Sequence, residues 1–326
     1  MECKRRHALA AGAALLGAGW VTRAAAQASD YPNAPVKIVV GFSAGGPTDL
    51  AARLVGAKLQ AAWGQPFLVD NRPGAGSNLA SEIVAAAAPD GYTLLMAAAP
   101  IAINGYLYKG LKYDVQKSFE PISQVMSAPC ILAVRPDSYK TLAELVAAAK
   151  QQPGKLSFSS SGPGGSQHLA GELLQQKAAI KLIHIPYKGA APALSDLIGG
   201  QISMGFMTSL SSVPYFTSGR LRALAVAAPQ RLPQLPDVPT MAEAGFPGVE
   251  VNSWSGLLAP AHTPPDIVTR LQREVVRALA APDLRDKLMS QGAVVVGSTP
   301  TEFAAYLARE HADYGKLIRS INLTLD

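Results

Sequence analysis

Short apolar segments alternate with longer amphipathic segments from residue 36 onward. Residues 36–40 (Val-Lys-Ile-Val-Val) are typical of a buried strand. Residues 48–60 place Leu50, Leu54 and Ala57 on one face of a helix. The same reasoning predicts strands at 67–69 and 92–96 and a helix at 78–88. This β-α-β-α-β order predicts an α/β fold with a mostly parallel sheet between helices.

The pattern resumes after Ser127-Ala128-Pro129, where we expect the chain to cross into a second lobe. An apolar run at 130–134 precedes a helix with the capping box Thr141–Glu144, and strands follow at 156–158, 181–185, 202–206 and 222–226. Five prolines between 229 and 247 indicate an irregular return route to a strand at 254–259. Two final helices are expected, from Pro264 with Thr263 as N-cap and from Pro300 with Thr299 and Glu302 as capping box.

The length of the chain favours two lobes. Without its first 26 residues it has about 300 residues, which is long for a single core. The expected division assigns residues 27–128 and 250–326 to lobe 1 and residues 129–249 to lobe 2.

The N-terminal segment has the features of an export signal. Lys4-Arg5-Arg6 precede an apolar run at 8–21, and Ala24-Ala25-Ala26 offers a cleavage site. The run is shorter than the ~20 residues of a membrane span. We therefore expect a periplasmic protein cleaved near Ala26, exported by either the general or the twin-arginine route.

Charge and cysteine content narrow the function. Removing residues 1–26 takes away four basic residues and one acidic residue, so the formal net charge falls from +6 to +3. With 16% charged residues and no basic run, the sequence does not indicate nucleic-acid binding. Only Cys130 remains, so no internal disulfide can form.

Two small-residue loops are the main candidates for chemistry. Residues 41–46 (Gly-Phe-Ser-Ala-Gly-Gly) and residues 159–166 (Ser-Ser-Ser-Gly-Pro-Gly-Gly-Ser) each join a predicted strand to a predicted helix. Backbone N–H groups and the positive end of a helix dipole meet at such a loop and favour an anion. A single loop could be a simple tight turn. Two such loops, one in each lobe, predict that both lobes bind the same small carboxylate.

Other chemistries fit less well. Residues 41–45 (Gly-Phe-Ser-Ala-Gly) match the G-x-S-x-G nucleophile elbow. Too few residues precede the strand at 36–40 to form the upstream loop that would supply an oxyanion donor. No spacing in the sequence pairs Ser43 with His262 or His311. Ser43 is favoured instead as a hydrogen-bond donor to a ligand. No glycine loop matches a nucleotide-binding motif. His168 and Glu172 lack a third metal ligand, so we expect no metal and no cofactor.

The chain resembles the substrate-binding receptors of tripartite tricarboxylate transporters, also called Bug-type periplasmic solute-binding proteins. The resemblance spans nearly the whole chain after residue 26. It rests on ordered blocks at residues 41–53, 69–76, 89–94, 107–108, 167–170, 186–189, 219–226 and 254–260.

The resemblance implies a two-lobed Venus flytrap that closes on a small organic carboxylate and delivers it to the membrane permease subunits of such a transporter. It implies no catalytic residue, and we expect a monomer. The ligand-binding positions carried over are Phe42, Ser43, Gly45, Gly46, Thr48, Ala98 and Ala99 from lobe 1, and Ser161, Gly162, Gly164, Ser166, His168 and Tyr187 from lobe 2.

Two departures from the family pattern bear on the ligand. Gly165 stands where a Ser or Thr is common, so Ser166 would supply that hydroxyl. Met207 stands where many members have Asp, which disfavours an amino-acid ligand and favours a plain or aromatic carboxylate if Met207 lines the cleft. Met207 could equally be a core residue. Three functional classes remain: transport receptor, ligand-presenting subunit of a membrane sensor kinase, and serine esterase using Ser43.

Overall fold

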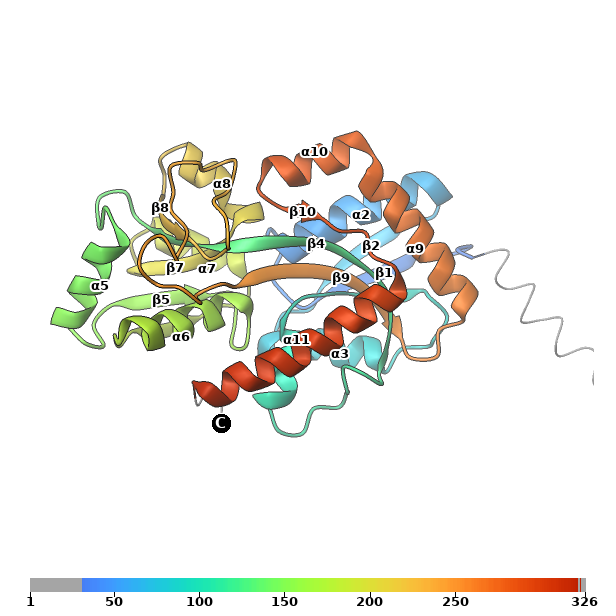
Figure 1. Cartoon of the computed structure of the whole chain (residues 1–326). Helices are drawn as coiled ribbons and strands as arrows, with labels where there is room; N and C mark the ends of the chain where they lie inside the picture. The colour runs from blue at the N-terminus through green and yellow to red at the C-terminus, as the bar shows by residue number, and fades with distance from the viewer. Residues whose placement is uncertain (1–30, 322, 324–326) are drawn as a thin grey trace, which may run out of the picture.

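A single mixed sheet of ten strands runs through both halves of the protein, which is described here by a computed structural model of residues 31–321 and 323. The main strand order is β2-β1-β3-β9-β4-β7-β5-β6, and β8 and β10 both pair with β4. The export signal predicted at 1–26 lies outside the described residues. Figure 1 shows helices on both faces of the sheet and the two long strands, β4 and β9, crossing the middle of the molecule.

Lobe 1 is the half that contains the N-terminal strands and the last helices. Its elements are β1 (Val36–Val40), α2 (Pro47–Trp63), β2 (Phe67–Asn71), η1 (Ala75–Ser77), α3 (Asn78–Ala85), β3 (Thr93–Ala97), α4 (Pro100–Ile103), η2 (Asn104–Tyr106), β9 (Asn252–Pro260), α9 (Pro265–Ala280), α10 (Pro282–Ser290), β10 (Val294–Val295) and α11 (Pro300–Ser320).

Lobe 2 repeats the strand–helix alternation. Its elements are α5 (Leu142–Gln151), β5 (Ser157–Ser160), α6 (Ser166–Ala178), β6 (Ile183–Pro186), α7 (Ala190–Ile198), β7 (Met204–Thr208), α8 (Ser209–Thr217) and β8 (Arg222–Val226). The strands β5, β6 and β7 are parallel, as β1, β2 and β3 are in lobe 1. The proline-rich segment between β8 and β9 forms no helix or strand, as predicted.

The strand β4 (Phe119–Val134) connects the two lobes. It pairs with β9 as far as Pro129, and from Cys130 onward it pairs with β7 and β8. The lobe boundaries predicted at residues 128 and 250 lie beside this change of partner and remain predictions. The apolar run at 130–134 is the end of β4, whose earlier residues were not predicted as a strand; β4 accommodates Pro121 at a register shift.

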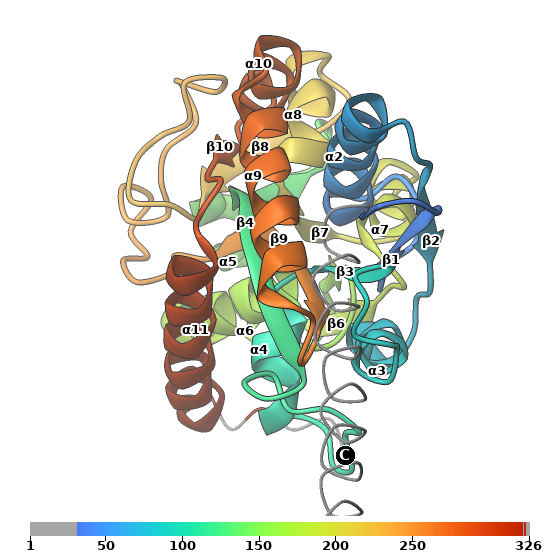
Figure 2. The same ribbon diagram turned by 90° about the vertical axis from the view of Figure 1, so that its right-hand side faces the viewer.

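The sheet is buried on both faces in lobe 1, which explains the almost continuous hydrophobic run of β1. Val36, Ile38 and Val40 pack in one core with α2 and α9, whereas Val39 packs in a second core with α3 and α11. In Figure 2, α9 lies between α2 and α11. The predicted stripe of α9 is buried: Val268, Leu271, Val275 and Leu279 all belong to the first core.

The helix ends follow the predicted caps at α5 and α11. Thr141 accepts a hydrogen bond from the Glu144 N–H, and Thr299 and Glu302 form a complete capping box. The predicted N-cap at Thr263 was wrong: Pro264 holds that position, and the Thr263 hydroxyl donates to the Pro260 carbonyl oxygen (2.8 Å).

The prediction of two final helices was also wrong, because a third helix, α10, lies between them. Ala281 is extended and Pro282 begins the new helix, as proline commonly does. None of the helices in residues 31–321 combines the length and the hydrophobicity that crossing a bilayer requires.

Candidate functional site

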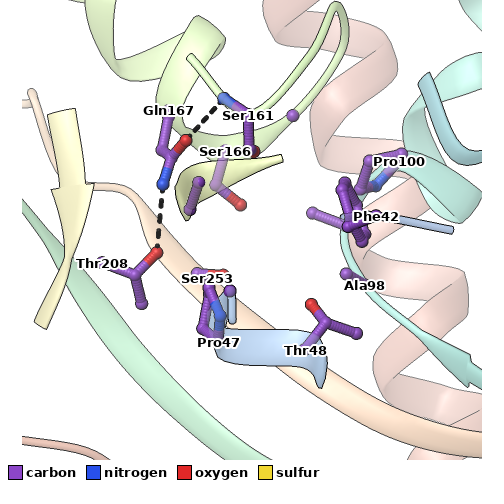
Figure 3. A pocket seen from close by; sticks show the side chains of 14 residues that line it. Phe42, Pro47, Thr48, Ala98, Pro100, Ser161, Ser166, Gln167, Thr208 and Ser253 are labelled. Atoms are coloured by element: carbon purple, nitrogen blue, oxygen red, sulfur yellow. Dashed lines mark hydrogen bonds between the residues drawn. The ribbon is translucent and has the colours of Figure 1, made fainter. Parts of the chain in front are cut away.

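A small cavity of about 20 Å³ lies where the two lobes meet, at the carboxyl ends of β1, β3, β5 and β7. This volume has room for about one water molecule, so a larger ligand requires the walls to move apart. It is lined by Phe42, Gly46, Pro47, Thr48, Ala98, Ala99, Pro100, Ser161, Gly165, Ser166, Gln167, Ala190, Thr208 and Ser253, several of which are drawn in Figure 3. None of these lining residues is ionisable at neutral pH.

Besides the one-turn helix α4, whose N-cap is Ala99, four longer helices begin at this cavity. The N-caps of α2, α6 and α8 are Gly46, Gly165 and Thr208, and α7 begins at Ala190; all four residues line the cavity. The N–H groups of a helix's first turn have no partner within the helix, and each N-terminus carries about half a positive charge. The cavity is therefore electropositive although it lacks a lysine or arginine side chain in its lining.

Asp49 holds the lobe 1 loop in shape. Its carboxylate, which is 2% exposed, accepts hydrogen bonds from the Gly45 N–H (2.9 Å), Asn71 Nδ2 (2.9 Å) and Arg53 Nε (3.0 Å). Burial raises the pKa of Asp49, but the bonds from Arg53, Gly45 and Asn71 outweigh it and hold the pKa below its ordinary value. Asp49 is thus an ionised structural anchor whose oxygens are occupied.

Gln167 and His168 hold the lobe 2 loop. The Ser161 N–H donates to Gln167 Oε1 (2.6 Å), and the Gly164 N–H donates to His168 Nδ1 (3.2 Å). His168 is buried and stacks on His184, with ring centroids 3.8 Å apart. Burial and the neighbouring His168 lower the pKa of His184 to about 3, so His184 is neutral at physiological pH.

Five of the residues that line the cavity carry a side-chain hydroxyl. Within residues 31–321, the hydroxyls of Thr48, Ser161, Ser166 and Ser253 have no protein hydrogen-bond partner. Gln167 Nε2 donates to Thr208 Oγ1 (3.3 Å), as Figure 3 shows, and so leaves the Thr208 hydroxyl proton available for another acceptor. These hydroxyls are free to bind a ligand.

Of the fourteen candidate binding positions, which include Met207, seven line the cavity. Phe42, Gly46, Thr48, Ala98, Ala99, Ser161 and Ser166 line it. Gly45 lies on a neighbouring groove beside α7 and α8, and Gly162 and Tyr187 line an adjacent hollow. The Tyr187 hydroxyl donates to Asp196 (2.6 Å).

The remaining four positions have other surroundings. His168 lies beneath the loop, and Gly164 approaches Asn104 of lobe 1 closely. Met207 packs in the lobe 2 core with Leu194 and Leu197 and is absent from the cavity lining. The argument that Met207 shapes the ligand site therefore has no structural support.

Ser43 contacts the opposite lobe. Its N–H donates to the Lys188 carbonyl oxygen (2.9 Å), and a Cβ on Gly189 would come within 2.2 Å of Ser43 Oγ. The Ser43 hydroxyl is buried and has no hydrogen-bond partner in the described part of the chain. No histidine among those residues activates it, which removes the geometric basis for a nucleophile elbow.

Sequence reasoning missed seven lining residues: Pro47, Pro100, Gly165, Gln167, Ala190, Thr208 and Ser253. Pro47 and Gly165 belong to the two loops already singled out. Thr208 lies two residues after the strand predicted at 202–206, which could have signalled it. The described residues contain no cluster of three metal-binding side chains; His168 Nε2 and Glu172 Oε1 are 3.5 Å apart.

Comparison with known proteins places these features in context. Residues 51–323 match the model of the tripartite tricarboxylate transporter family receptor. Protein BugT of Bordetella pertussis is 35% identical over 91% of this chain and 92% of its own length. A protein encoded in the tcbD-tcbE intergenic region of Pseudomonas sp. strain P51 is 38% identical over 96% of this chain and 94% of its own length.

Solved structures agree with the fold. The periplasmic binding protein BugD has a TM-score of 0.87 and 34% identity, covering 90% of this chain and all of its own. Rpa4515 of R. palustris, solved with adipate, has a TM-score of 0.88 and 34% identity over 91% of this chain and all of its own. MatC of Rhodopseudomonas palustris, solved with malate, has a TM-score of 0.83 and 34% identity over 88% of this chain and all of its own. The two-lobed periplasmic binding protein fold is thereby confirmed.

Proposed function

Because the chain belongs to the tripartite tricarboxylate transporter receptor family, whose structural neighbours are solute-binding proteins and not enzymes, we propose that it captures a small organic carboxylate between its lobes. It then presents the closed, loaded form to the permease subunits of a tripartite tricarboxylate transporter. It acts as a monomer in the periplasm, after cleavage of the export signal near Ala26.

The observation that carries this proposal is the convergence of four helix N-termini on a cavity without ionisable side chains. A carboxylate can accept several N–H and O–H bonds there, and each charge-assisted bond contributes about 1.5–3 kcal/mol. A cationic ligand would meet the positive ends of the dipoles and find no carboxylate. The adipate in Rpa4515 and the malate in MatC support a carboxylate as the ligand class.

The test is a thermal-shift screen of the mature protein against dicarboxylates, aromatic acids and amino acids. A ligand present at 100 times its Kd stabilises a protein by about 2.7 kcal/mol, which raises Tm by roughly 4 °C for a chain of this size. The carboxamide analogue of each stabilising acid is the matched control, because it has the same shape without the charge. The proposal fails if no acid raises Tm, or if the carboxamides raise it equally.

A further inference from the structure

Two larger depressions border the small cavity. The hollow, of about 200 Å³, is lined by residues 74–77 of lobe 1 and 186–188 of lobe 2, and shares Phe42 and Ser161 with the cavity. The groove, of about 450 Å³, is lined mainly by α7 and α8 and shares Ala190 with the cavity. Because the cavity has room for about one water molecule, an organic acid enters it only where its walls move apart.

Buried contacts tie the lobes together on the groove side. Leu210 of α8, in lobe 2, lines the groove and belongs to the first hydrophobic core of lobe 1. Next to it, the Ser209 hydroxyl donates to the Gly292 carbonyl oxygen of lobe 1 (2.9 Å). Opening the interface at the groove would expose Leu210 and break this hydrogen bond, and both changes are unfavourable.

The hollow lies at the opposite extreme of the strand order from the connection between the lobes. Residues 74–77 follow β2 and residues 187–188 follow β6, the two ends of the main strand order, whereas the connecting strands β4 and β9 lie in its middle. Glycines meet here: a Cβ on Gly162 would lie 4.0 Å from the Gly76 Cα. Opening the interface at this edge breaks the hydrogen bond from the Ser43 N–H to the Lys188 carbonyl oxygen (2.9 Å).

Each depression is lined by a single residue that is charged at neutral pH. Among the described residues, Lys188 has this place in the hollow and Arg220 in the groove, and no acid lines either. Lys188 is exposed, and no acid in the described part of the chain pairs with its ammonium. The Arg220 guanidinium lies over the ring of Tyr215, 5.2 Å from its centroid. A cleft whose charges have one sign attracts ions of the opposite sign from solution.

We infer that the hollow is the entrance to the cavity and that Lys188 attracts the carboxylate of the incoming acid to it. This inference rests on the proposed function and adds the route by which the acid arrives. Lys188 lines the hollow and not the cavity, so it acts on the anion over a distance and makes no bond to the bound carboxylate. Attraction of this kind raises the association rate constant, and salt screens it.

Stopped-flow mixing of the mature protein with an acid, followed by tryptophan fluorescence, tests the inference. The acid is whichever of adipate, malate and benzoate raises Tm most, or the best acid of the thermal-shift screen if none of the three binds. At 20 mM NaCl, Lys188→Glu is expected to lower the association rate constant about fivefold and to change the dissociation rate constant less than about twofold. At 300 mM NaCl the loss is expected to shrink to less than about twofold.

Arg220→Glu is the matched control, because it reverses the same charge in the groove on the other side of the cavity. It is expected to lower the association rate constant less than about twofold at either salt concentration. Lys188→Gln, which removes the charge without reversing it, is expected to lie between the wild type and Lys188→Glu. Calorimetric Kd values at both salt concentrations provide a second measurement: the ratio of Lys188→Glu to wild type is expected to fall as salt is added.

The outcomes separate this inference from carboxylate capture. If Arg220→Glu slows association as much as Lys188→Glu, or more, the hollow is not the entrance. If Lys188→Glu mainly speeds dissociation and its effect on Kd persists at 300 mM NaCl, Lys188 bonds to the bound acid. Either result, or unchanged association in Lys188→Glu, overturns the inference while capture stands. If no acid binds the wild type, carboxylate capture itself fails.

Discussion

At the scale of single residues, the cavity depends on groups that do not line it. Asp49 and His168 each accept a backbone N–H bond, from Gly45 and Gly164, and so set the shape of a loop. Both are buried. Because their acceptor atoms are occupied, they position the N–H groups around the ligand without competing for it.

The buried His184 makes stability depend on pH. Its pKa of about 3 in the folded protein is below the ordinary value of 6.5, so the unfolded chain binds the extra proton between these values. The stabilisation from neutral His184 is complete above about pH 6.5 and is lost as the pH falls towards 3.

Urea denaturation at pH 7 and pH 4 measures how the free energy of unfolding depends on His184. The wild type is expected to lose roughly 1–3 kcal/mol more free energy of unfolding than His184→Gln over that interval. Between pH 7 and pH 8 the difference between the two proteins should stay constant, which serves as the internal control. Equal losses on acidification would show that His184 carries its proton in the folded protein as readily as in the unfolded chain.

At the scale of elements, the turn between β6 and α7 is where lobe 2 approaches the lobe 1 loop. Gly189 lies in that turn with φ +155°, and a Cβ there would come within 2.2 Å of Ser43 Oγ and 3.0 Å of the Ser43 N. The Ser43–Lys188 backbone hydrogen bond is formed at the same point. A side chain at position 189 would therefore keep the two loops from meeting as they do in this structure.

Gly189→Ala is expected to weaken acid binding at least tenfold, because the new methyl group prevents the loops from meeting. Gly219→Ala is the matched control: Gly219 also has a positive φ, +70°, but a Cβ added there would have nothing within 4 Å of it. Small-angle scattering with saturating acid should show a larger radius of gyration for Gly189→Ala than for the control. Equal affinity and equal radius in the two variants would contradict a closure contact at Gly189.

Elements with local signals were predictable from the sequence. The run at 36–40, the glycines that follow it and Pro47-Thr48-Asp49 specify a buried strand, a turn and a helix start, and the structure has all three. The helix α10 was missed because the break before it is a single extended residue, Ala281, although Pro282 at its first position is a signal for a helix start.

The cavity was predictable only in part, since its polar side depends on long-range contacts. Gln167 and Thr208 are joined by a hydrogen bond across 41 positions of sequence, and Ser253 comes from a third element. Met207 illustrates a further limit: all five residues of β7 are buried, so alternation along the strand gives no indication of which side chain reaches the cavity and which enters the core.

At the scale of the whole molecule, the long strand β4 lets the two lobes share one ligand site. It pairs with β9 in lobe 1 and with β7 and β8 in lobe 2, so the lobes are joined by continuous sheet. The helix N-termini from both lobes converge on the cavity beside it. The central claim is that these backbone N–H groups hold a carboxylate.

Position 166 allows that claim to be tested directly. Ser166 is the first residue of α6, where proline fits a helix, and the preceding Gly165 has φ −77° and ψ 162°, which suit a residue before proline. The chain already uses this arrangement at Gly46-Pro47, the start of α2. Ser166→Pro removes the hydroxyl and the N–H, whereas Ser166→Ala removes the hydroxyl alone.

The decisive measurement is calorimetric titration of the tightest-binding acid into the wild type, Ser166→Ala and Ser166→Pro, with Tm of each protein measured without ligand. A lost charge-assisted bond of about 1.5–3 kcal/mol corresponds to roughly tenfold or more in Kd. The account predicts that Ser166→Pro binds at least tenfold more weakly than Ser166→Ala while the two unliganded proteins unfold within about 2 °C of each other. Equal affinity of the two variants would contradict it.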